Sequence, residues 1–211
     1  MTSLNRSAEI AALAVLALLL AYAIVTIAGL LSLQSPELPI ADPYFTAMEL
    51  LILILAPALV WLMILLQRWA PEDKKHWATG ALVFMAITAG MTSAVHFSVL
   101  VLTHAGVASA WLLSFRWPSV AYALDILAWD VFFSLSAICT AFVFTVAGMA
   151  RWARLLFLTS GVLSGLGLAG VAAGDMQLRN IGVLGYAGVF PLGVGCFALL
   201  LRVERRCSVD P

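Results

Sequence analysis

Four ionisable side chains interrupt the long apolar runs of this chain and are its best candidates for chemistry. They are Glu49, His96, Asp125 and Asp130. Such groups are costly in hydrocarbon unless they are paired, neutralised or hydrated. Histidine exchanges a proton near neutral pH, and a neighbouring carboxylate can fix its tautomer and stabilise its charge. We therefore predict an acid–base site whose catalytic residues are His96 as acid or base, Asp125 as its orienting partner and Glu49 as a second acid.

A structural role is the alternative for the same residues. A His96–Asp125 pair can simply join two helices, although such interhelical bonds contribute only about 1 kcal/mol or less. Glu49 lies near the expected N-terminus of its helix, where the helix dipole and interfacial water lower the cost of its charge. Both interpretations require the side chains to lie close together.

Neighbouring polar and aromatic residues are candidates for ligand binding. These are Asp130, Trp129, Tyr122 and Ser93. Trp129 is four residues from Asp125 and therefore shares its helical face. Asp125 and Asp130 are five residues apart, about 140° around an α-helix. We therefore expect only one of the two aspartates to face a pocket and the other to contact a neighbouring helix or subunit.

The composition shows what surrounds these residues. Of the 211 residues, 64% are hydrophobic and 10% are charged, and the mean hydropathy is +1.06. Soluble domains carry roughly 25% charged residues, because their exterior needs side chains compatible with water. The formal net charge is zero, so nothing points to nucleic acid as a partner. The sequence predicts one multi-pass integral membrane domain surrounded by membrane lipids.

Six apolar runs are long enough to cross a bilayer, which takes about 20 helical residues. The predicted fold is all-α, a polytopic membrane bundle of six transmembrane helices formed by residues 1–211. The spans are expected at approximately 9–33, 44–69, 77–103, 120–149, 152–174 and 181–201. The boundary between the fourth and fifth spans is the weakest, because only Ala150 and Arg151 separate them. Pro191 is expected to kink the sixth span.

Basic residues gather on one side of this topology. Nine of the eleven lysines and arginines fall near the chain ends or in the second–third and fourth–fifth connections. Only Arg116 and Arg179 fall on the other side, and no lysine or arginine is expected deep within a span. The positive-inside rule then puts both termini in the cytoplasm. We expect the protein in a bacterial cytoplasmic membrane.

Three of the candidate residues are expected at the same depth. At 1.5 Å per residue, Glu49, His96 and Asp125 lie about 7, 10 and 9 Å below the outer ends of their helices, and Asp130 about 17 Å below. The second, third and fourth spans therefore position a polar site in the extracytoplasmic half of the bilayer.

The last two spans are rich in glycine. Gly161 and Gly165 form a G-x-x-x-G pair, as do Gly170 and Gly174, and five more glycines follow between 182 and 195. Small residues at this spacing let helix backbones approach closely. We expect close packing against a neighbouring helix or, in a homo-oligomer, against a second subunit.

Metal sites and cofactors are not predicted. His96 and His104 lie about 12 Å apart along a helix axis, too far to share one ion. The sequence contains no P-loop, H-E-x-x-H or G-x-S-x-G motif and no C-x-x-C pair. The two lysines, Lys74 and Lys75, lie in a connection between spans, which excludes a retinal-type Schiff base.

Three functions remain open, and the sequence does not decide whether the chain is an enzyme. The first is a membrane-embedded enzyme or binder that acts on a lipid or hydrophobic small molecule by acid–base chemistry, such as isomerisation or hydration. The second is a proton-coupled transporter or channel, although no titratable residue continues the path toward the cytoplasm. The third is a nonenzymatic scaffold or accessory subunit.

Overall fold

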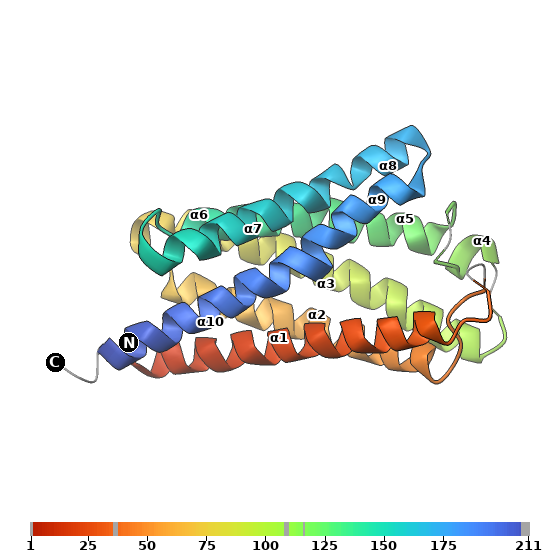
Figure 1. Cartoon of the computed structure of the whole chain (residues 1–211), viewed down its shortest axis with the longest axis horizontal. Coiled ribbons are helices and arrows are strands. Elements are labelled where there is room, and N and C mark those ends of the chain that lie inside the picture. Colours follow the sequence, from red (N-terminus) through yellow and green to blue (C-terminus); the bar gives the residue numbers. More distant parts are fainter. Residues whose placement is uncertain (1, 36–37, 108–109, 116, 208–211) are drawn as a thin grey trace.

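The computed structural model describes residues 2–35, 38–107, 110–115 and 117–207, and the regular structure in these segments is entirely helical. Six helices are long and apolar enough to cross a membrane, as predicted. They run over Ser3–Leu31, Tyr44–Trp69, Glu72–His104, Val120–Val143, Gly148–Ala173 and Met176–Cys207. The helices form one elongated bundle, in which the start of the first and the end of the last lie at the same end (Figure 1).

Several of these long helices are built from shorter elements. The first two are α1 (Thr2–Leu31) and α2 (Tyr44–Trp69), and the third joins η1 (Glu72–Lys74) to α3 (Lys75–His104), after which α4 (Ala110–Leu113) lies in a connection. The fourth consists of α5 (Val120–Ile126), η2 (Leu127–Phe133) and α6 (Ser134–Val143). The fifth consists of α7 (Gly148–Leu166) and α8 (Leu168–Ala173), and the sixth of α9 (Met176–Val183), η3 (Leu184–Val189) and α10 (Phe190–Cys207).

Two of these elements, η2 and η3, are π-helical. The η3 stretch directly precedes Pro191, which has no backbone N–H to donate to the preceding turn. The sixth span therefore stays continuous and accommodates its proline by widening. No proline accompanies η2, and π-helical turns of this kind are frequent at functional sites.

The turn between the fourth and fifth spans lies earlier than predicted. Phe144 has an extended backbone and ends α6, and Gly148, with a φ of +56°, begins α7. Arg154 Nη1 donates to the Phe144 carbonyl at 3.3 Å across this turn. The predicted boundary near Ala150 and Arg151 was wrong because the apolar run continues through the turn itself.

Glycines of the last two spans pack within the chain. A Cβ added to Gly161 would lie 2.8 Å from the Ser134 carbonyl oxygen, and one added to Gly185 would lie 2.7 Å from that of Ser160. These helices therefore approach so closely that their contact excludes any side chain at those positions. The packing needs no second copy, and the homo-oligomer stays a prediction.

Aromatic rings fill the core between the middle of the bundle and the end that holds the termini. The rings of Phe133, Phe190, Phe157, Phe144 and Phe197 form a continuous series with centroid distances of 4.8–5.7 Å. All five are buried. This half of the bundle is a packed apolar core.

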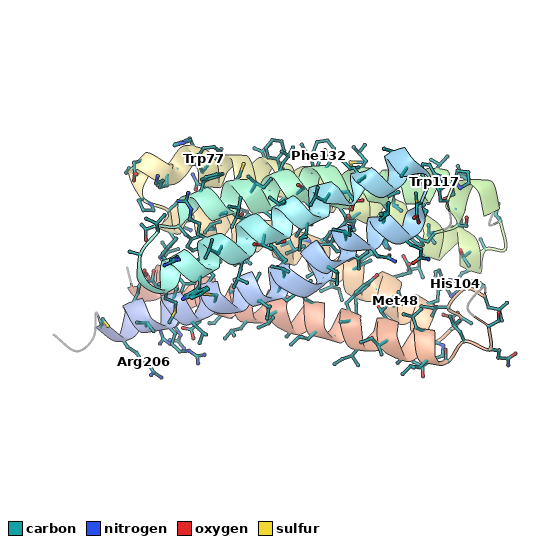
Figure 2. All side chains as sticks on the ribbon, turned by 45° about the horizontal axis from the view of Figure 1, so that its top comes forward. Met48, Trp77, His104, Trp117, Phe132 and Arg206 are labelled. Carbon is teal, nitrogen blue, oxygen red and sulfur yellow. The ribbon has the colours of Figure 1, made fainter. Side chains whose placement is uncertain are left out.

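An ionic cluster joins α1 to α10 at the end that holds the termini. Glu9 accepts hydrogen bonds from Arg202 Nε at 2.7 Å and from Arg205 Nη2 at 2.9 Å. We call Glu9, Arg202 and Arg205 the terminal cluster. Trp77 and Arg206 lie at this end of the bundle, whereas Trp117 and His104 lie at the other (Figure 2).

Candidate functional site

The three predicted catalytic residues meet between α2, α3 and α5. His96 is 6% exposed, and its Nδ1 lies 2.8 Å from Glu49 Oε2. Its other ring nitrogen, Nε2, lies 3.6 Å from Asp125 Oδ1. Three helices thus bring one imidazole and two carboxylates together, as their common depth in the sequence indicated.

The two carboxylates differ in their contact with the imidazole. At 2.8 Å, a carboxylate of Glu49 accepts a hydrogen bond from His96 Nδ1–H, which fixes the tautomer and leaves Nε2 to exchange a proton. The 3.6 Å separation from Asp125 is too long for a hydrogen bond. From the sequence, Asp125 was predicted to orient the His96 imidazole, whereas the distances favour Glu49 for this role.

Arg179 is the residue that the sequence analysis missed. It is 5% exposed, and its Nε donates to Asp130 Oδ2 at 3.2 Å. Its Nη2 lies 3.5 Å from Asp125 Oδ2, and its Nη1 donates to the Tyr122 hydroxyl at 2.9 Å. We call Glu49, His96, Asp125, Arg179 and Asp130 the cavity cluster.

The expectation that Arg179 lies outside the sixth span was therefore wrong. The sixth span begins at Met176, where the Asp175 side chain caps α9, rather than at about 181. Arg179 consequently belongs to the first turn of the span and not to a connection. The signal was available, because two aspartates within an apolar span require a cation and Arg179 was one of two basic residues on their side of the predicted topology.

Asp125 lines the cavity and Asp130 does not, which agrees with the expectation that only one of the two faces a pocket. Both nevertheless contact Arg179 of α9, so the two side chains lie closer together around the helix than expected. The 140° separation assumed a regular α-helix. Residues 127–133 are π-helical instead, with hydrogen bonds between residues five apart, which brings residues at that spacing toward one face. Asp130 lies within this stretch and Asp125 just before it.

Two glycines make room for the deepest carboxylate. A Cβ at Gly167 would lie 3.0 Å from Asp130 Oδ2, and one at Gly182 would lie 3.1 Å from Asp130 Oδ1. The side chain of Asp130 is fully buried, and no hydrogen bond from the described residues reaches its Oδ1. The glycine-rich helices therefore serve the cavity cluster as well as general packing.

A cavity of about 1030 Å³ lies beside the cluster. Glu49, His96 and Asp125 line it, together with Trp129 from η2. Most of the remaining lining is apolar and comes from α1, α2, α3, η3 and two outer connections. A largely apolar cleft or cavity with a few convergent polar groups is the usual form of a small-molecule site.

The connection between the third and fourth spans covers part of this cavity. Leu113, Ser114 and Phe115 line it, and the Phe115 ring lies 5.0 Å from the His96 ring. The Ser119 hydroxyl donates to the Ser114 carbonyl and holds this segment at the start of α5. The largely apolar composition of the connection was the signal that it packs on the bundle.

The cavity reaches the surface of the bundle at two places. Ile27 of α1 and Ala187 of η3 both line it and are both exposed, which gives it an opening on the side of the bundle. At the end of the bundle away from the termini, Asp42 lines it and is exposed. The Thr46 hydroxyl and backbone N–H donate to Asp42 and hold the pKa of its carboxyl below the usual range.

The remaining predicted binding residues have different positions. Tyr122 contacts Arg179 behind the cavity and is not part of its lining. Ser93 lies in a separate groove of about 420 Å³ together with Pro57 and Trp61, and it is not part of the cavity lining. The lining tyrosines of α1 and η3, Tyr22 and Tyr186, were missed, although a tyrosine within an apolar span is itself unusual.

Among the described residues, no group of three or more His, Cys, Asp or Glu side chains is arranged to hold a metal ion. Comparisons of this chain with protein-family models, with curated proteins and with solved structures gave no match.

Proposed function

We propose that this chain is an integral membrane protein that binds a lipid or another hydrophobic small molecule and acts on it by acid–base chemistry at His96. The observation that carries the proposal is the large apolar cavity with a hydrogen-bonded Glu49–His96 pair in its wall. The apolar lining suits a hydrophobic body, and the pair offers a group that can accept and return a proton.

The chemistry follows from the contacts of the imidazole. Neutral His96 accepts a proton from the ligand at Nε2, and the resulting imidazolium is stabilised by Glu49 on one side and Asp125 on the other. In an isomerisation, the electron pair of the broken C–H bond forms a new double bond. The proton then returns to a different carbon, so protons and electrons balance without another reactant.

Arg179 acts in this proposal as a positioning residue. Its guanidinium contacts both Asp125 and Asp130, so it offsets their charges and limits the movement of Asp125 beside the imidazole. Asp125 therefore interacts with His96 electrostatically, while Arg179 on the other side of Asp125 holds its carboxylate in position.

The proposed orientation puts the cavity in the extracytoplasmic half of a bacterial cytoplasmic membrane. Basic residues gather at the end of the bundle that holds the termini, including Arg202, Arg205 and Arg206. The positive-inside rule favours this end for the cytoplasm. The side opening between α1 and η3 would then face the outer leaflet.

Proton-coupled transport has less support. In the described part of the chain, no buried acidic, basic or histidine side chain lies between Asp130 and Glu9 of the terminal cluster. The aromatic series from Phe133 to Phe197 occupies that half of the core instead. A nonenzymatic scaffold also has less support, because a scaffold has no use for the cavity.

Deuterium incorporation tests the proposed chemistry. The purified protein in lipid nanodiscs is incubated with a total lipid extract in D₂O, and the extract is returned to H₂O before mass spectrometry. Deuterium on oxygen and nitrogen is then lost, whereas deuterium that His96 delivered to carbon remains. We expect one class of hydrophobic molecule to gain carbon-bound deuterium.

Variants show whether the exchange belongs to the site. His96→Gln and Glu49→Gln should abolish it, because each removes a member of the proton-exchanging pair. Glu72→Gln is the control, since Glu72 is an exposed acid in η1 and does not line the cavity. Labelling that persists in a folded His96→Gln protein would refute the acid–base role.

A further inference from the structure

We propose that the ligand of this cavity carries a protonated amine at its polar end, with an apolar body behind it. The inference rests on the proposed function and adds the chemical class of the ligand. Three observations support the inference: the charge of the cavity wall, an oxygen of Glu49 that accepts no hydrogen bond, and the aromatic rings in the cavity wall.

The charge of the wall favours a cation. The described ionisable residues that line the cavity are the acids Asp42, Glu49 and Asp125, with His96 and the two tyrosines, and none of them is a lysine or arginine. The cavity cluster as a whole contains three carboxylates but only one guanidinium and one imidazole. The carboxylates outnumber the two cationic side chains even when the imidazole is counted as a cation, so a ligand cation suits this charge arrangement.

The acceptor is the second oxygen of a buried carboxylate. Glu49 is 3% exposed, and its Oε2 is taken by His96. Its Oε1 receives no hydrogen bond from the described residues, although the side chain lines the cavity. Asp125, on the opposite side of the imidazole, makes only contacts of 3.5–3.6 Å. Both carboxylates thus have capacity for the N–H donors of an ammonium group.

Aromatic rings supply the third observation. Trp129 and Tyr186 stand against each other in the wall, with centroids 5.1 Å apart, and Tyr22 faces the cavity from α1. A cation beside such rings is attracted by their electron-rich faces, and the attraction grows when water is excluded. The apolar residues that make up most of the remaining lining suit a hydrocarbon body.

Three probes with the same chain length test the inference: decylamine, 1-decanol and decanoate. At pH 7 the amine is protonated and the acid is ionised. Binding of each radiolabelled probe is measured to the protein in nanodiscs of zwitterionic lipid, with empty nanodiscs subtracted. We expect decylamine to bind at least about tenfold more tightly than decanol, the gain expected for one charge-assisted hydrogen bond, and decanoate to bind least.

Variants connect this preference to the cavity. Glu49→Gln and Asp125→Asn should each weaken decylamine binding by about tenfold and leave decanol nearly unchanged. Glu72→Gln should alter neither. Should one site variant fail to fold, the comparison of the three probes on the unmodified protein still decides the matter.

The outcomes separate this inference from the proposed function. Ala23→Trp fills the cavity from α1 and should remove binding of every probe. If all probes respond to Ala23→Trp but the amine has no advantage, the inference is wrong and the cavity remains a hydrophobic binding site. If no probe responds to Ala23→Trp, the proposed function itself fails.

Discussion

The two ionic clusters of this bundle are built from similar side chains but differ in how completely those side chains are paired. In the terminal cluster, the single carboxylate of Glu9 is held by two guanidiniums at 2.7 and 2.9 Å, and these arginine side chains are 42% and 36% exposed. In the cavity cluster, the buried carboxylates of Glu49 and Asp130 and the partly buried carboxylate of Asp125 share one guanidinium and one imidazole at 2.8–3.6 Å.

The surroundings of the two clusters also differ, because one lies near the surface and the other beside the cavity. The terminal cluster joins α1 to α10 near the end of the bundle, where its arginines reach the surface. The cavity cluster lies beside a large apolar space and keeps carboxylate oxygens without donors. A carboxylate whose two oxygens are both held by arginines, as in the terminal cluster, is typical of a structural contact. Carboxylate oxygens that lack a donor and lie beside a cavity, as in the cavity cluster, can accept hydrogen bonds from a ligand.

Replacing Arg179 should have the largest effect on stability. Arg179→Met leaves Asp125 and Asp130 without their cation, and we expect a loss of about 3–5 kcal/mol in the free energy of unfolding. Reversible unfolding in sodium dodecyl sulfate measures it. Adding Asp130→Leu to the same protein should recover much of the loss, because it removes the deepest unpaired charge. A single variant as stable as the unmodified protein would contradict the proposed charge balance.

A smaller loss is expected from Gly170→Ala. The added Cβ would lie 2.5 Å from the backbone nitrogen of Arg179, so α8 and α9 must separate where they position that residue. Overpacking of this kind costs about 1–3 kcal/mol. Gly188→Ala is the matched control, since nothing lies within 4 Å of its added Cβ. Equal melting temperatures for the two variants would show that the contact at Gly170 does not matter.

Glu9→Gln should have the smallest effect. Its arginine partners reach water when the carboxylate is neutralised, so we expect a loss of about 1 kcal/mol or less and no change in ligand binding. The same unfolding measurement compares it directly with Arg179→Met. If Glu9→Gln proved as costly as Arg179→Met, the distinction between the two clusters would be lost.

The sequence predicted the six-helix architecture well because apolar runs and their polar interruptions are local features. That Glu49, His96 and Asp125 lie close together could be predicted because the helical rise gives each residue's distance from the end of its helix, and these distances were similar. What it missed depends on departures from the regular helix. The π-helical turn that aligns Asp125 with Asp130, and the early start of α9 that brings in Arg179, have no marker in periodicity.

The cavity was beyond prediction for a different reason. The volume of the cavity depends on how α1 packs against α2 and α10, because residues of α1 and η3 together form part of the cavity wall. It also depends on how two connections fold over the cavity cluster. These are relations between segments far apart in the chain. The last two spans were recognised as rich in packing glycines, but that Gly167 and Gly182 border a carboxylate depends on a third helix.

The most direct test of the central claim is to identify what the cavity holds. The protein is extracted with its surrounding lipids, and molecules that remain with it are quantified by mass spectrometry. Ala23→Trp fills the cavity, whereas Leu20→Trp puts the same ring on the exposed face of the same helix. We predict one hydrophobic molecule, enriched over bulk lipid, with the unmodified protein and Leu20→Trp and lost from Ala23→Trp. Bulk lipid alone in all three, or equal enrichment in a folded Ala23→Trp protein, would contradict the account.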